Sequence, residues 1–98
     1  MFSIVIPTYN NLKYVKLCID SIKKNSSLKH EIIVHSNIGS DGTNDYLLRN
    51  NIKYTHSKKN IGLCSSINIA SKLSSTNYIL YSHDDMYFCP EWDQILIT

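Results

Sequence analysis

The sequence lacks the cysteine pattern of a zinc site or of a disulfide framework. Its three cysteines, Cys18, Cys64 and Cys89, are odd in number and far apart, and no CxxC pair occurs. Zinc sites and disulfide scaffolds need closely spaced or paired cysteines. We therefore expect reduced, buried thiols and a cytoplasmic protein.

The sequence also lacks an excess of charge of one sign and any long apolar run. A formal net charge of +2 is too small to favour a nucleic-acid or anionic membrane surface. The apolar run at residues 2–7 has no basic flank and is far too short to cross a bilayer, so neither a signal peptide nor a transmembrane segment is expected. No internal repeat is visible. Its content of 43% hydrophobic and 18% charged residues indicates one globular domain.

Four short apolar runs predict the strands of a sheet. They cover residues 2–7, 31–35, 52–56 and 78–82, and several are rich in Ile and Val. Continuous apolar runs of this length are typical of strands buried on both faces. The third run alternates apolar and polar residues, so we place it nearer an edge of the sheet.

Helical periodicity appears between these runs. Leu12, Val15, Ile19 and Ile22 recur at steps of three or four residues, which places them on one face of a helix. Asn10 or Asn11 is a suitable N-cap for this helix. Further helices are predicted over residues 45–49, around residues 63–70, and from Pro90 through an apolar side formed by Trp92, Ile95 and Leu96.

Alternating strands and helices predict a mostly parallel sheet covered on both faces. In such sheets ligands bind at the carboxyl ends of the strands. Three polar segments, Thr8–Asn11, Ser36–Thr43 and His83–Asp85, each follow a predicted strand. We expect them to converge on one edge, with the first strand between the second and the fourth.

Two adjacent carboxylates, Asp84 and Asp85, end the fourth predicted strand. Carboxylates at a strand end need solvent or a cation, and hard ions such as Mg²⁺ and Mn²⁺ bind oxygen ligands shared with substrate phosphates. An ordinary acidic turn is the alternative. Asp41 likewise fits a helix cap, Asn60 and Gly62 fit a turn, and Tyr9 fits either base stacking or packing.

The motifs together are more specific than any one of them. The opening FSIVIPTYN is followed by a Gly-Ser-Asp-Gly-Thr turn, by Asn-x-Gly, and by a hydrophobic strand that ends in His-Asp-Asp with Pro and Trp soon after. This order and spacing resemble the N-terminal half of family 2 glycosyltransferases. The resemblance covers essentially the whole chain. It implies a partial domain at residues 1–98 with an α/β, GT-A-like (Rossmann-like) fold: a mostly parallel sheet with helices on both faces, truncated at the C-terminus.

The resemblance also implies a set of binding residues. The nucleotide-sugar-binding residues would be Pro7, Thr8, Tyr9, Asn37, Asp41, Asn60, Gly62 and Asp84. Asp85, with His83, would bind Mn²⁺ or Mg²⁺.

The sequence departs from the family pattern at four positions. Ser36 stands beside Asn37 where the family usually has two acidic residues, Ile67 replaces an arginine beside Asn68, and His83 replaces the first aspartate of the metal motif. Histidine ligates Mn²⁺ but suits Mg²⁺ poorly. The family's catalytic base lies beyond the metal motif, so we expect it beyond residue 98; Glu91 and Asp93 are expected to cap the last helix instead.

The function that the resemblance implies is transfer of a sugar from a nucleotide-diphosphate donor to an unknown acceptor, which is a glycan, a lipid or a protein. A truncated or non-catalytic sugar-nucleotide-binding module is one alternative. A nucleotidyltransferase is another, although residues 8–13 lack the glycine-rich basic loop expected of it. The isolated chain is expected to be marginally stable or self-associating, and inactive.

Overall fold

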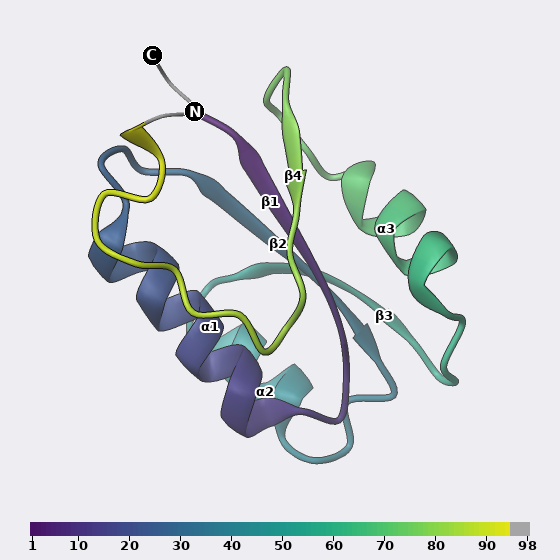
Figure 1. Cartoon of the computed structure of the whole chain (residues 1–98). Helices are drawn as coiled ribbons and strands as arrows, with labels where there is room; N and C mark the ends of the chain where they lie inside the picture. Colours follow the sequence, from purple (N-terminus) through teal and green to yellow (C-terminus); the bar gives the residue numbers. More distant parts are fainter. Residues whose placement is uncertain (95–98) are drawn as a thin grey trace.

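A computed structural model describes residues 1–94 of the 98-residue chain. Its elements alternate as the sequence predicts (Figure 1). In chain order they are β1 (Ser3–Tyr9), α1 (Leu12–Asn25), β2 (Glu31–Asn37), α2 (Thr43–Arg49), β3 (Lys53–Ser57), α3 (Leu63–Ser71) and β4 (Ile79–Tyr81).

The four strands form one parallel sheet in the order β3-β2-β1-β4. The first strand therefore lies between the second and the fourth, and the strand of alternating pattern lies at an edge, as predicted. Parallel strands need crossover connections, and the three helices provide them.

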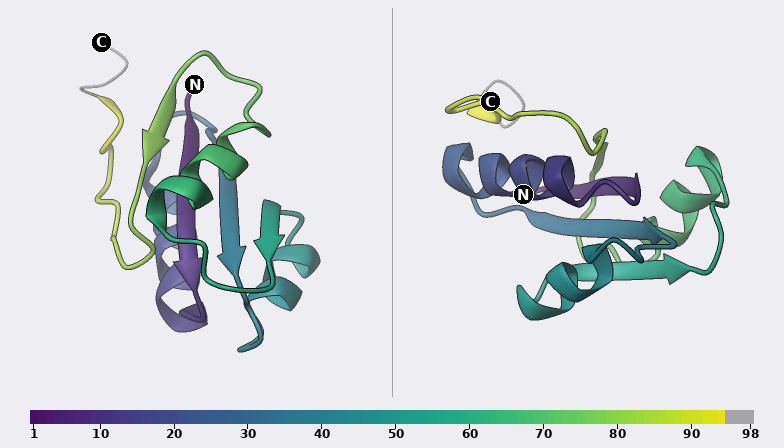
Figure 2. Two further views of the ribbon diagram at one scale, coloured as in Figure 1. Left: turned by 90° about the vertical axis from the view of Figure 1, so that its right-hand side faces the viewer. Right: turned by 90° about the horizontal axis from the view of Figure 1, so that it is seen from below.

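Helices cover both faces of the sheet (Figures 1 and 2). On one face, α1 and α2 bury alternate strand residues such as Ile4, Ile6 and Val34. On the other face, α3 packs Ala70 against Val5 and Ile33, which point the opposite way because side chains alternate along a strand. The predicted α/β architecture, a parallel sheet with helices on both faces, is confirmed. None of the helices in residues 1–94 is long and apolar enough to span a membrane.

After β4, residues 82–94 form a strap that runs back along α1 (Figure 2). The backbone N–H of Phe88 donates to Ser21 Oγ at 2.9 Å, and Asn25 Nδ2 donates to the Phe88 carbonyl at 2.6 Å. The N–H of Glu91 donates to the Asn25 carbonyl at 2.8 Å. The strap therefore returns the chain from the carboxyl ends of the strands to their amino ends.

The predicted helix does not begin at Pro90, since residues 90–93 are a series of turns and Gln94 is the first helical residue after them. Trp92 lies in an aromatic cluster with Phe88 at 4.7 Å, His30 at 5.3 Å and Phe2 at 6.2 Å between ring centroids. Its Nε1 donates to Ser26 Oγ at 2.9 Å. Trp92 therefore packs against aromatic side chains of its own domain. Ile95 and Leu96, the other residues of the predicted apolar side, and Ile97 after them lie outside the described residues.

The prediction that Asp93 caps its own helix is also wrong. Asp93 is fully buried and accepts hydrogen bonds from the backbone N–H groups of Ser27 and Leu28, at 2.8 to 3.1 Å, and from His30 Nε2 at 2.6 Å. His30 Nδ1 in turn accepts the N–H of Phe2 at 3.1 Å. Burial alone would raise the pKa of Asp93, but these donors hold it well below its ordinary value. A carboxylate of the strap thus closes the loop after α1.

The cysteines follow the prediction only in part. All three are free, but Cys64 and Cys89 are exposed, and only Cys18 is buried. Burial raises the pKa of the Cys18 thiol to about 11. Cys18 is therefore a core residue of α1 rather than a reactive thiol.

Candidate functional site

The predicted site residues gather at the carboxyl edge of the sheet, where the strands end. In the β1–β2 register Thr8 lies opposite Ser36, and Tyr9 lies opposite Asn37. The acidic turn follows β4, which is the neighbour of β1 on the other side. The predicted convergence of the three polar segments on one edge is therefore confirmed.

Asp84 is tied to the end of the first strand. Its Oδ2 accepts a hydrogen bond from Thr8 Oγ1 at 2.8 Å and another from Asn11 Nδ2 at 3.1 Å. Its Oδ1 accepts no hydrogen bond from the described residues. The side chain of Asn11 makes no capping bond to α1, although the helix begins after it as predicted. This use of Asn11 was missed from the sequence, because its partner lies 73 residues away.

His83 and Asp85 flank that carboxylate and are both exposed. His83 contacts Tyr81, the last residue of β4, with Tyr81 Oη 3.0 Å from His83 Nδ1 and the rings edge-on at 5.1 Å. Burial, followed by the charges of Asp84 and Asp85, raises the pKa of Tyr81. The phenol therefore faces the acidic turn.

Asn37, one of the predicted nucleotide-sugar-binding residues, is engaged by other groups of the chain. It is buried, and its Nδ2 donates to the Thr8 carbonyl at 3.1 Å and to Ser66 Oγ at 3.0 Å. Its Oδ1 accepts hydrogen bonds from Ser57 Oγ at 3.1 Å and from the N–H of Ile61 at 3.0 Å. Both ends of the amide are occupied, so Asn37 braces β1, the loop after β3 and α3 against one another.

Asp41 caps two helices at once. It accepts hydrogen bonds from the N–H of Leu12 at 3.0 Å and from the N–H of Thr43 at 3.1 Å, and a third from Thr43 Oγ1 at 2.5 Å. Burial alone would raise the pKa of Asp41, but these donors lower it below its ordinary value. Asp41 therefore joins the loop after β2 to the start of α1, and this is the helix-cap role that the sequence left open.

The turn before α3 carries two more of the predicted residues. The N–H of Gly62 donates to Asn60 Oδ1 at 3.0 Å, and Gly62 has a φ of 85°, which favours glycine. Of the residues on β1, Pro7 is half-buried and Tyr9 is 53% exposed. Tyr9 does not pack into the core, which was one of its two interpretations.

The turn after β2 brings the backbone of Gly39 into close contact with two polar side chains, which the sequence pattern does not predict. Gly39, at a φ of 72°, lies so close to its neighbours that a Cβ atom there would be 2.3 Å from Asn44 Oδ1 and 2.4 Å from Ser36 Oγ. Both of these oxygens are buried and have no hydrogen-bond partner in residues 1–94. The Ser36 hydroxyl and the Asn44 side chain are thus packed closely against Gly39, and only glycine fits at this position of the turn.

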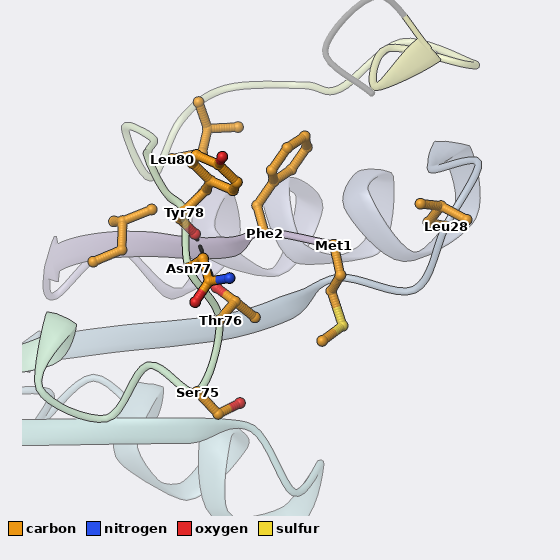
Figure 3. Close-up of a pocket in the computed structure, with 9 residues that line it drawn as sticks. Met1, Phe2, Leu28, Ser75, Thr76, Asn77, Tyr78 and Leu80 are labelled. Atoms are coloured by element: carbon orange, nitrogen blue, oxygen red, sulfur yellow. Dashed lines mark hydrogen bonds between the residues drawn. The ribbon is translucent and has the colours of Figure 1, made fainter. Parts of the chain in front are cut away.

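The described residues also outline two hollows at the opposite, amino edge of the sheet. One has a volume of about 820 Å³ and is lined by Met1, Phe2, Leu28 and residues 75–80 (Figure 3). No carboxylate, imidazole or lysine lines it. The other, of about 860 Å³, lies around the loop after α1. Neither includes any of the predicted site residues.

Comparison with known proteins assigns the family. The family model for glycosyl transferase family 2 matches residues 3–98. This chain belongs to glycosyl transferase family 2. Two similar relatives are uncharacterized glycosyltransferases, of Rickettsia typhi (33% identical over 90 residues) and of Mycoplasma genitalium (33% identical over 97 residues). In each case 90% of this chain is matched, and it spans only 28% and 32% of the relative's length.

Solved structures of glycosyltransferases share this fold. S. aureus TarS in complex with UDP has a TM-score of 0.84 and 26% identity over 98% of this chain and 30% of that one. The mannosyltransferase PcManGT of Pyrobaculum calidifontis, in complex with GDP-Man and Mn²⁺, has a TM-score of 0.79 and 18% identity, and this chain covers 30% of it. The GT-A fold of the family 2 domain is therefore shown, and the chain spans about a third of these proteins.

Proposed function

We propose that this family 2 domain binds a nucleotide-diphosphate sugar at the carboxyl edge of its sheet, as part of a glycosyltransferase. The observation that carries the proposal is the placement of Asp84 by Thr8 and Asn11, between the exposed His83 and Asp85. Family membership supports the reaction class, and the complexes of TarS with UDP and with UDP-GlcNAc support the donor class.

The residues of the acidic turn fit a divalent ion that is shared with a ligand. No group of three or more His, Cys, Asp or Glu side chains in residues 1–94 is arranged to hold a metal by itself. Mg²⁺ and Mn²⁺ at phosphate sites are commonly bound by one or two protein ligands plus the substrate's phosphate oxygens. Asp85 and His83, exposed and adjacent to the positioned Asp84, supply such a partial set.

In this proposal each residue of the turn has a distinct task. Asp85 and His83 would hold Mn²⁺ or Mg²⁺, which when bound would stabilise the negative charge that develops on the departing nucleoside diphosphate. Asp84 keeps the turn against β1, because two of its hydrogen bonds are already made to the chain. The preference for Mn²⁺ is supported by the imidazole of His83, and the mannosyltransferase of the same fold was solved with Mn²⁺.

The nucleoside would lie over the ends of β1 and β2. The exposed ring of Tyr9 is suited to stack on a base, and Pro7 and Thr8 form the floor beside it. The N-terminus of α3, which follows Asn60 and Gly62, would face the phosphates with its backbone amides, and Asn60 would hold the turn before it by accepting the Gly62 N–H. Asn37 and Asp41 would act by fixing these loops, since their polar atoms are engaged within the chain.

Titration calorimetry with UDP tests the proposal. We expect UDP to bind the wild-type chain in the presence of Mn²⁺, and Asp85→Ala to abolish the Mn²⁺-dependent part of that binding. Ser36→Ala should have a smaller effect, because Ser36 lies outside the acidic turn. Asp45→Ala is the matched control, since Asp45 is an exposed carboxylate on α2.

Equal, metal-independent binding by the wild type and Asp85→Ala would refute the metal assignment. A parallel assay of UDP release from UDP-GlcNAc tests catalysis, and binding without release would favour a non-catalytic module in this stretch. Light scattering of the same samples checks the predicted self-association.

A further inference from the structure

The contact between Tyr81 and His83 is the one feature of the acidic turn that the proposed function leaves unexplained. Tyr81 Oη lies 3.0 Å from His83 Nδ1, within hydrogen-bond distance, and the rings meet edge-on at an interplanar angle of 66°. His83 is exposed, and its other ring nitrogen, Nε2, has no hydrogen-bond partner in the part of the chain that the structure describes. A surface histidine is therefore oriented by one specific neighbour.

The hydrogen bond to Tyr81 decides which ring nitrogen of His83 is free to bind a metal. A neutral imidazole carries its proton on one nitrogen and a lone pair on the other, and only the nitrogen with the lone pair binds a metal. A phenol hydroxyl can accept a hydrogen bond as well as donate one. When Nδ1–H donates to Tyr81 Oη, the lone pair is left on Nε2.

We propose that Tyr81 is a positioning residue that holds His83 with Nε2 ready to bind a divalent ion, and that this pair makes the site prefer Mn²⁺ over Mg²⁺. The inference rests on the proposed function, because it concerns the same acidic turn. Partners that orient a histidine ligand typically change metal affinity about 10- to 100-fold when they are removed. A nitrogen ligand suits Mn²⁺ better than Mg²⁺, which is bound almost entirely by oxygen.

The test compares Tyr81→Phe with the wild type in titrations with UDP and either Mn²⁺ or Mg²⁺. We expect UDP binding with Mn²⁺ to weaken about 10-fold in Tyr81→Phe, and binding with Mg²⁺ to change less than about twofold. Tyr78→Phe is the matched control. Tyr78 directly precedes β4, at the end of the strand opposite to Tyr81; it is 70% exposed, and its hydroxyl makes no contact with His83. It should bind like the wild type with both metals.

A second measurement separates positioning from a general loss of structure. Pulsed electron paramagnetic resonance of the Mn²⁺–UDP complex detects nitrogen bound directly to the metal. We expect this nitrogen signal in the wild type, a weaker one in Tyr81→Phe, and none in His83→Asp. Because His83→Asp removes the imidazole, adding Tyr81→Phe to it should change Mn²⁺-dependent binding less than about twofold, as expected when the two residues act through each other.

The outcomes distinguish this inference from the proposed function. Mn²⁺-dependent binding of UDP that is equal in the wild type and Tyr81→Phe would overturn the role of Tyr81 alone. A wild-type complex with no nitrogen signal would overturn the roles of both Tyr81 and His83, and would leave Mn²⁺-dependent binding at Asp85 standing. An absence of any Mn²⁺-dependent binding in the wild type would overturn both. Should Tyr81→Phe fold poorly, the nitrogen signal of the wild type and the selectivity of His83→Asp, which should shift toward Mg²⁺, still decide the question.

Discussion

Glu31 is expected to stabilise the amino edge of the sheet through its charge. Its carboxylate accepts hydrogen bonds from Ser3 Oγ at 2.7 Å, from Lys53, and from the N–H and Oγ of Ser75 at 2.9 and 2.8 Å. These groups come from β1, β3 and the loop before β4. Replacing Glu31 by Gln removes the charge and keeps the shape of the side chain.

The size of the effect follows from the proton affinity of this carboxyl group. Burial alone would raise the pKa of Glu31, but the Lys53 ammonium and the serine donors lower it from 4.5 to about 2. At 1.36 kcal/mol for each tenfold change in proton affinity, this difference corresponds to about 3.4 kcal/mol at most. The side chain of Lys53 is 50% exposed, so solvent screens part of that sum, and we expect about 2 kcal/mol.

The sign of the pH dependence is fixed by the direction of the shift. Because the folded-state pKa is lowered, the stabilisation by Glu31 is fully present above pH 4.5 and is lost as the pH falls from 4.5 through 2. The free energy of unfolding of Glu31→Gln should therefore lie about 2 kcal/mol below that of the wild type at pH 7. The gap should shrink steadily below pH 4.5.

Urea denaturation followed by the fluorescence of Trp92, the single tryptophan, measures both quantities. Asp45→Asn is the control, because Asp45 and Arg49 form an exposed pair on α2 that is expected to contribute about 0.3–0.5 kcal/mol. A gap between wild type and Glu31→Gln that is the same at pH 7 and pH 3 would show that shape, not charge, is responsible. No gap at pH 7 would refute the assignment of Glu31 altogether.

Three further substitutions probe the strap, the turn after β2 and the acidic turn. Asp93→Asn should lower the free energy of unfolding at pH 7 by about 3 kcal/mol, measured in urea, because it replaces a fully buried carboxylate that accepts hydrogen bonds from Ser27, Leu28 and His30. Gly39→Ala should lower the free energy of unfolding by about 2–4 kcal/mol in the same assay, and Gly62→Ala by only about 1 kcal/mol. Both glycines have a positive φ, but only at Gly39 would the added Cβ atom clash with neighbouring atoms. Thr8→Val should weaken Mn²⁺-dependent UDP binding about 10-fold in calorimetry, because Asp84 loses a donor worth about 1.5 kcal/mol; unchanged binding would contradict the positioning of Asp84 by β1.

The sequence predicts those parts of the fold that depend on local pattern and on chain direction. Apolar runs predict the strands, and the rule that parallel strands end at one edge predicts that Thr8 and the acidic turn lie together. The parts that were missed depend on distant partners. Asp93 bonds to His30 across 63 positions, and nothing in its immediate surroundings distinguishes a buried carboxylate from a helix cap. Asn37 is similarly predicted to contact the ligand, because a sequence does not reveal which polar groups form hydrogen bonds with one another within the fold.

The distribution of polar contacts along the strands separates stability from binding in this domain. At the amino edge, Glu31 and the Asp93–His30 pair are buried or nearly so and have every oxygen engaged by the chain. At the carboxyl edge, Asp84 keeps one free oxygen, and Asp85 is exposed. A carboxylate whose oxygens all accept hydrogen bonds within the chain has no free oxygen for a ligand, whereas an exposed carboxylate held near other carboxylates keeps its affinity for a cation.

Substitutions at the amino edge should therefore change the free energy of unfolding and leave the affinity of the folded protein for Mn²⁺ and UDP unchanged. Asp85→Ala should lower that affinity and leave the free energy of unfolding unchanged. A loss of nucleotide affinity in folded Glu31→Gln would show that the two edges are coupled through the sheet, and this separation would then be wrong.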